Sequence, residues 1–78
     1  MNFKKVNIIE CGSAKEAMTA KSCIPSYINM ELVASITEIE SNMEIQMLGT
    51  TITTSLCQIF VNGQGCLFVM ASPQELLE

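Results

Sequence analysis

Four residue types are absent from this 78-residue chain: histidine, arginine, aspartate and tryptophan. Ser-His-Asp and Cys-His catalysis both need a histidine, so these nucleophilic mechanisms are excluded. Metal ligation by histidine is excluded as well, and without arginine no side chain contacts phosphate or guanine in a bidentate manner. The composition therefore predicts a protein that is not an enzyme.

Positive charge is scarce and is confined to the start of the chain. The lysines all lie within the first 21 residues: Lys4, Lys5, Lys15 and Lys21. Residues 22–78 contain six glutamates and no cation, and the sequence pI is about 4.6. A nucleic-acid binder normally shows a dense basic patch, so this charge distribution argues against nucleic acid as a partner.

Long apolar runs are missing too. The longest stretches are interrupted by Thr, Gln, Asn or Gly, far short of the roughly 20 residues that span a membrane. After Lys4 and Lys5 the chain continues as VNIIE, which lacks the long apolar core of a signal peptide. The sequence therefore predicts a cytoplasmic protein with no membrane contact, whose cysteines stay reduced.

Apolar residues are nevertheless abundant, at 49 % of the chain against 15 % charged residues. A chain of this length is expected to form a single domain, residues 1–78. Domains of this size bury only about 60 % of their unfolded surface, and oligomerisation is a common way to cover the rest. We therefore expect the protein to associate with itself, as a dimer or a larger homo-oligomer.

Local patterns predict a mostly β protein. β-branched and alternating apolar residues indicate strands at 2–10, 26–28, 32–40 and 43–47, with a threonine-rich edge strand at 50–54. Capping boxes at Ser13–Glu16 and Ser72–Glu75 predict a short helix at 14–21 and a short C-terminal helix. The predicted fold class is α+β, mostly β: a small, strongly bent antiparallel sheet or a barrel-like meander.

The stretch CQIFVNGQGCLFVMA, residues 57–71, predicts a hairpin that is apolar on both faces. Asn62-Gly63 favours a two-residue turn, and Gly65 permits a longer loop or a bulge. We expect one face to pack with Met43, Ile45 and Met47 and to carry the following residues: Cys57, Ile59, Val61, Cys66, Phe68 and Met70. The other face would carry Leu56, Phe60, Leu67 and Val69.

That second face needs a cover. The candidates are the C-terminal leucines Leu76 and Leu77, the 14–21 helix and a second subunit. Because both helices are short, we predict a subunit interface at Phe60, Leu67 and Val69.

Two segments resemble a known family of short proteins. SYINMELVASITEIE is similar to the opening of the FlbD/SwrD-like domains, in which an Ile-Asn pair leads through a turn into an apolar strand. CQIFVNGQGCLFVMASPQELLE resembles their closing hairpin and helix start. Residues 11–24 and 41–56 depart from the family pattern. The resemblance implies a bent antiparallel sheet with a terminal helix and a role as a motility accessory protein, and it implies no functional residue.

The cysteines offer no metal site. Cys11, Cys23, Cys57 and Cys66 are separated by 11, 33 and 8 residues, whereas zinc sites usually draw on closely spaced pairs. We expect no metal and no cofactor, and we interpret the cysteines mainly as small core residues. Cys57 and Cys66 are expected to lie on the same face of the hairpin.

Two surface groups remain as candidate sites. Glu38, Glu40 and Glu44 are either a solvated acidic surface or a surface for a basic partner protein. Lys4 and Lys5 are candidate ligands for a small anion.

The leading functional hypothesis is a homo-oligomeric binding protein that inhibits a partner or host protein by occluding a site on it. Small acidic proteins of phages and mobile elements counter host defence in this manner. An alternative is an oligomeric sponge that sequesters a nucleotide-like anionic signal.

Overall fold

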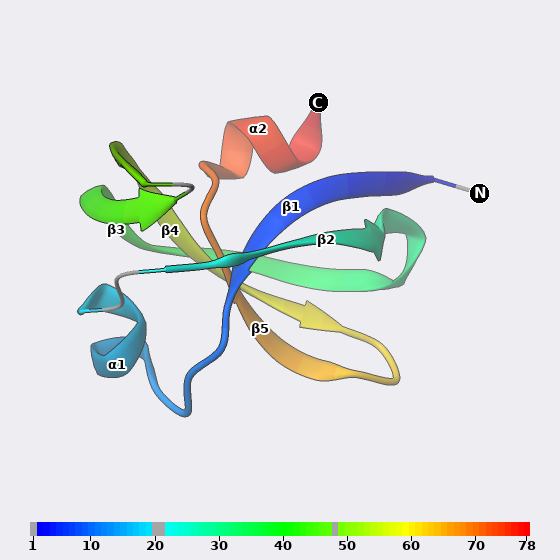
Figure 1. The fold of residues 1–78 in the computed structure, drawn as a ribbon. Helices are drawn as coiled ribbons and strands as arrows, with labels where there is room; N and C mark the ends of the chain where they lie inside the picture. The colour runs from blue at the N-terminus through cyan, green and yellow to red at the C-terminus, as the bar shows by residue number, and fades with distance from the viewer. Residues whose placement is uncertain (1, 20–21, 48) are drawn as a thin grey trace.

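The computed structural model describes residues 2–19, 22–47 and 49–78. Its elements, in chain order, are β1 (Phe3–Ile9), α1 (Ala14–Met18), β2 (Ile24–Asn29), the 3₁₀ turn η1 (Met30–Leu32), β3 (Val33–Met47), β4 (Thr50–Val61), β5 (Gly65–Val69) and α2 (Pro73–Leu77). The strands form one antiparallel sheet with the order β2-β1-β5-β4-β3 (Figure 1). The predicted fold, mostly β with a bent antiparallel sheet and two short helices, is confirmed.

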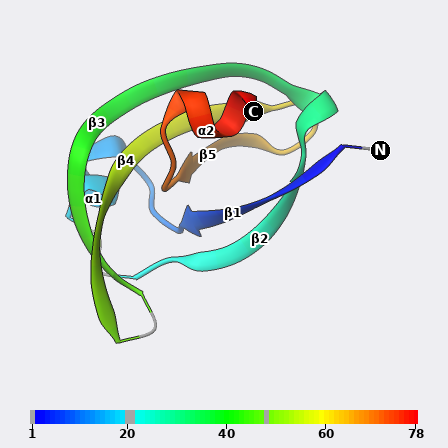
Figure 2. The ribbon, with the colours of Figure 1, turned by 90° about the horizontal axis from the view of Figure 1, so that it is seen from above.

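The sheet is a meander that stops one pairing short of a closed barrel. β1 pairs with both β2 and β5, β5 with β4, and β4 with β3. β2 and β3 are consecutive and joined by η1, yet they are the two edges of the sheet. Figure 2 shows β3 curving along one side of the molecule and β2 along the other, with α2 between them in this view. The molecule is therefore open between β2 and β3.

β3 is one long strand where the sequence pattern predicts two. The predicted break at 41–42 is wrong, because β3 runs from Val33 to Met47. Its register against β4 shifts between Val33 and Ser35 and twice more between Glu38 and Met43. Such bulges bend a strand without ending it. The Ser41-Asn42 pair therefore marks a bend in β3 rather than a turn.

The β4–β5 hairpin has a three-residue loop. Val61 lies opposite Gly65, and the Gln64 N–H donates to the Val61 carbonyl over 3.0 Å. Gly63 and Gly65 have φ of 89° and 88°, which glycine adopts without the steric cost of a side chain.

This loop sets a register different from the predicted one. Cys57 lies opposite Val69, and Phe60 lies opposite Cys66, so Cys57 and Cys66 lie on opposite faces. The predicted grouping of the hairpin faces is therefore wrong in β5, where every residue lies on the face opposite to the expected one.

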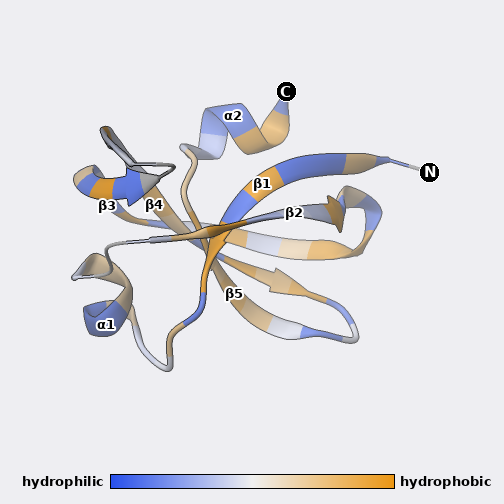
Figure 3. Cartoon of the chain, viewed as in Figure 1, coloured by the Kyte–Doolittle hydropathy of each residue, from blue (hydrophilic) through white to orange (hydrophobic). Residues whose placement is uncertain are grey.

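Both faces of the hairpin are covered within one chain. One cluster, here called the α2-side cluster, contains Val6, Ile28, Cys57, Ile59, Val61, Val69, Ala71 and Leu76. The other, the α1-side cluster, contains Ile9, Ala17, Met43, Ile45, Leu56, Phe68 and Met70. Figure 3 shows that β4 and β5, which run between the two clusters, are largely hydrophobic in sequence. Met43 and Ile45 thus pack with Phe68 and Met70, as predicted. From β4, however, Leu56 joins them in place of Cys57, Ile59 and Val61. The side chain of Met47 lies outside the described residues.

The two helices begin at their predicted caps. The Ser13 hydroxyl accepts a hydrogen bond from the Glu16 N–H at 3.3 Å, and the Ser72 hydroxyl accepts one from the Glu75 N–H at 3.1 Å. α1 ends at Met18, earlier than predicted, and residues 20–21 of the predicted helix lie outside the described residues. Each helix buries one side chain: Ala17 in α1 and Leu76 in α2.

Candidate functional site

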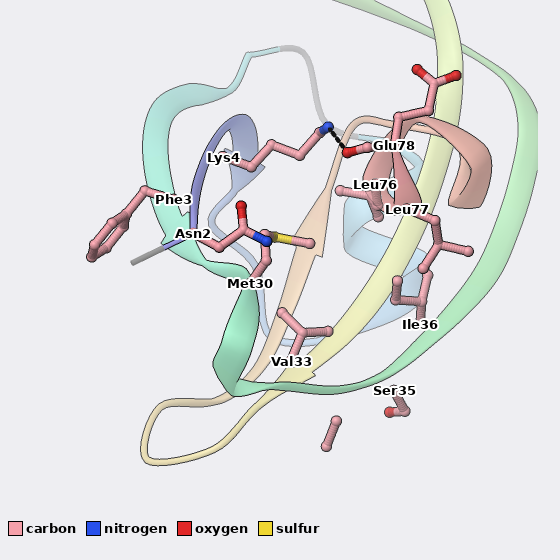
Figure 4. Close-up of a pocket in the computed structure, with 11 residues that line it drawn as sticks. Asn2, Phe3, Lys4, Met30, Val33, Ser35, Ile36, Leu76, Leu77 and Glu78 are labelled. Atoms are coloured by element: carbon pink, nitrogen blue, oxygen red, sulfur yellow. Dashed lines mark hydrogen bonds between the residues drawn. The ribbon is translucent and has the colours of Figure 1, made fainter.

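A groove of about 650 Å³ opens between the start of β1, the start of β3 and the end of α2. It exists because α2 has only five residues and cannot cover the whole opening between the two sheet edges. Apolar side chains of η1, β3 and α2 line it: Met30, Val33, Ile36 and Leu76. Figure 4 shows these residues around the groove, with Lys4 and Glu78 at its rim. The volume is typical of pockets that hold small ligands or a partner's side chains.

The rim of the groove carries opposite charges. The Lys4 ammonium donates a hydrogen bond to the main-chain oxygen of Glu78 over 3.1 Å (Figure 4). Lys4 lies opposite Ile28, whereas Lys5 lies opposite Tyr27 on the other face of the sheet. Consecutive residues of a strand point to opposite faces. Lys4 and Lys5 therefore do not converge on one ligand within a protomer, contrary to the predicted anion site.

Exposed apolar side chains gather around the same end of the molecule. We call Phe3, Leu32, Phe60 and Leu77 the open-end surface; each is at least 39 % exposed. Hydrogen bonds connect the segments that carry them: Met30 N–H to the Asn2 carbonyl at 2.7 Å, and Asn62 N–H to the Leu32 carbonyl at 2.8 Å. In Figures 1 and 2, η1, the β4–β5 loop and the start of β1 lie at one end of the molecule. Exposed apolar side chains at one end of a molecule are candidates for an interaction site.

Of the predicted interface residues, Phe60 is exposed and Leu67 is partly exposed. Val69 is fully buried in the α2-side cluster, and Leu67 is partly buried against it. The prediction is therefore wrong for Val69, and for Leu67 it stays a prediction. Leu76 and the neighbouring strands cover the hairpin face for which the sequence predicts a second subunit.

The acidic residues Glu38, Glu40 and Glu44 are all exposed on β3. They lie opposite Cys57, Leu56 and Thr53 respectively, and none of them lines the groove. They therefore form an acidic stretch on one sheet edge, separate from the open-end surface. Their role as a partner-binding surface stays a prediction.

The cysteines differ in exposure. Cys57 is fully buried, Cys11 and Cys23 are partly buried, and Cys66 is exposed. Burial raises the pKa of the Cys57 thiol to about 11, with smaller contributions from the charges of Glu38 and Glu75. Burial also raises the pKa values of Cys11 and Cys23. Within the described ranges, no three Cys or Glu side chains are grouped closely enough to hold a metal ion.

The raised pKa of Cys57 predicts a loss of stability at alkaline pH. Above the ordinary thiol pKa of 9.0 the unfolded chain loses this proton, whereas the folded chain keeps it up to about pH 11. The unfolded state then binds fewer protons, so the free energy of unfolding falls between these values, by roughly 2 kcal/mol. Urea denaturation at several pH values measures this fall.

The Cys57→Ala variant should show a shallower decline over the same range. Cys66→Ala, which alters an exposed thiol, should keep the wild-type pH dependence. Equal pH dependence of the wild type and Cys57→Ala would contradict the assignment.

Sequence reasoning missed the groove and most of the open-end surface. Phe3 and Leu32 have the pattern of core strand residues, and no local signal distinguishes an exposed from a buried apolar residue at a strand end. The groove combines residues from three distant segments, and only the folded chain brings them together.

No described helix is both apolar enough and long enough to cross a bilayer. Comparison with known proteins adds no family: no family model, no curated protein and no solved structure matches the chain. The resemblance to FlbD/SwrD-like domains therefore stays a prediction.

Proposed function

We propose that this protein is a non-enzymatic, homo-oligomeric binding protein that inhibits a partner protein by occluding a site on it. One observation carries the proposal: three of the four aromatic residues, Phe3, Tyr27 and Phe60, are exposed, and only Phe68 is buried. Aromatic side chains are enriched in protein interfaces and dominate their energetics. A small domain that places them on its surface rather than in its core is built to bind.

The open-end surface supplies the apolar part of the interface, and Glu38, Glu40 and Glu44 supply an acidic border for a partner with basic residues. Complementary charge of this kind accelerates association and selects the partner. We place the protein in the cytoplasm and assign it to the class of counter-defence proteins encoded by phages or mobile elements. Small size, acidity and the lack of catalytic residue types support this assignment.

The partner-binding proposal is tested by recovery of the bound protein from a lysate of the source cells. Changing Leu32 and Phe60 together to serine is expected to reduce recovery of the dominant partner at least about tenfold, because an apolar interface loses its central contacts. Reversing the charge at Glu38, Glu40 and Glu44 should have the same effect. Quantitative mass spectrometry of the recovered protein gives the measurement.

Met18→Ser is the matched control for this experiment. Met18 is 42 % exposed, close to the 41 % of Phe60, but it lies on α1. Recovery should be unchanged in this variant. Equal losses for Met18→Ser and for the open-end variant would show that the open-end surface is not the binding site.

A second candidate is the sequestration of a small anionic ligand. The apolar groove with Lys4 at its rim favours it. Heating the purified protein should then release a compound with nucleotide-like absorbance, and Lys4→Ala should abolish this release, whereas Lys15→Ala should not. Protein that releases no such compound would exclude the sponge.

A further inference from the structure

The two open edges of the sheet differ in how well they are protected against pairing with another strand. An unpaired edge is a template for a further strand, and proteins protect such edges with charged residues and bulges. β3 carries Glu38, Glu40 and Glu44 and has three register shifts. β2 has the sequence IPSYIN, which contains no charged residue, and its register against β1 is regular over all six residues. Proline protects an edge as well, and β2 has one, Pro25, near its start. β2 is therefore the less protected of the two edges.

The direction of the main-chain groups of β2 follows from one hydrogen bond. The Met30 N–H donates to the Asn2 carbonyl, in line with the register in which Phe3 lies opposite Asn29. Hydrogen-bonded positions alternate along an antiparallel pair. Ile24, Ser26 and Ile28 therefore face β1 with their main-chain groups, and the residues between them face the open edge.

The residues that face the open edge are Pro25, Tyr27 and Asn29. Pro25 lacks an N–H group, but no hydrogen bond to β1 is lost because Pro25 faces the open edge. The main-chain N–H and C=O of Tyr27 and the main-chain N–H of Asn29 point to this edge, where another strand can pair with them. Tyr27 lies beside Lys5. Its side chain is 69 % exposed, more than that of any other aromatic residue in the chain.

We propose that β2 pairs with β2 of a second copy of this chain, antiparallel about a two-fold axis at Tyr27. The two Tyr27 residues then exchange main-chain hydrogen bonds, and the Asn29 N–H of each copy donates to the Pro25 carbonyl of the other. This register extends over β2 from Pro25 to Asn29 and requires no N–H from Pro25. The two tyrosine rings lie side by side on one face, a favourable cross-strand pair.

A second copy fits this edge better than a strongly charged partner does. β2 itself is neutral, and its neighbour β1 contributes Lys5 beside Tyr27, while Glu31 follows β2 in η1. Charges of both signs next to a neutral edge suit an isologous contact, in which each patch meets its own copy. The same pairing through β3 would bring glutamates of the two copies within cross-strand reach, and like charges there are destabilising. The inference rests on the homo-oligomer of the proposed function and specifies its geometry.

Complementary charges at position 27 test the two-fold axis. Tyr27→Lys and Tyr27→Glu each place like charges opposite one another, and each should raise the dissociation constant of the dimer at least about 100-fold. An equimolar mixture of the two variants should recover the dimer, because lysine then faces glutamate. Sedimentation equilibrium across micromolar concentrations measures all three samples, and circular dichroism checks that the variants are folded. Met18→Lys and Met18→Glu, at an exposed position on α1, should dimerise like the wild type.

Each outcome bears on a different claim. A wild-type dimer whose Tyr27 variants associate equally tightly would overturn pairing through β2 and leave the homo-oligomer standing. Variants that dissociate but do not recover on mixing would overturn the axis at Tyr27. A wild type that stays an 8.5 kDa monomer at these concentrations would overturn both this inference and the homo-oligomer of the proposed function.

Discussion

Phe68→Ala is expected to lower the free energy of unfolding by about 3–5 kcal/mol, the range for truncating a buried phenylalanine. Phe68 is 8 % exposed and packs in the α1-side cluster with Ile9, Leu56 and Met70. It is the chain's one buried aromatic residue, so no neighbour of similar size can fill the cavity. A loss of this size is a large part of the 5–15 kcal/mol that stabilises a typical domain.

Phe60→Ala is the matched control, because it removes the same atoms from the same hairpin. Phe60 is 41 % exposed, so its truncation should cost less than about 1 kcal/mol. Urea denaturation followed by far-ultraviolet circular dichroism suits this comparison, since the chain has no tryptophan. Similar losses of stability in the two variants would contradict the observed burial of Phe68 and the observed exposure of Phe60.

Leu76→Ala is expected to cost about 2–5 kcal/mol, whereas Leu77→Ala should change stability by no more than about 0.5 kcal/mol. The two leucines are adjacent in α2, but Leu76 is 3 % exposed in the α2-side cluster and Leu77 is 76 % exposed. Leu76 is the contact by which the five-residue helix α2 enters the core. Its truncation should therefore release the helix as well as open a cavity.

The same denaturation experiment measures the leucine pair, and protease sensitivity of the C-terminal segment gives a second readout. Cleavage near Ser72 should become faster in Leu76→Ala and stay unchanged in Leu77→Ala. A destabilised Leu77→Ala together with a stable Leu76→Ala would mean that α2 docks through its opposite face.

The helix starts and most strands were predictable because their signals are local. A serine followed three residues later by glutamate caps a helix through its own hydroxyl, and both predicted caps are observed. The run of β-branched residues at 50–54 favours extended backbone wherever it lies, and it forms the first half of β4. The bend of β3 was not predictable, because a bulge depends on the register of the neighbouring strand.

The candidate site was less predictable than the fold. The glutamates of β3 are exposed, as expected for charged residues, but the sequence does not say that they lie on a free edge. Adjacency in the sequence predicts that Lys4 and Lys5 act together, although the alternation of a strand sends them to opposite faces. The shortness of the helices predicts a subunit interface that includes Val69, yet the bent sheet buries Val69 within one chain.

The sequence by itself determined the class of this protein. Its caps, glycines and β-branched runs define where most helices, turns and strands begin. The tertiary structure alone decided which apolar residues became core and which became surface. One residue of loop length decides the face of β5: with three residues between β4 and β5, Phe68 lies on the same face as Leu56 and enters the α1-side cluster. Phe60 lies on that face too, but nearer the loop, and it stays exposed.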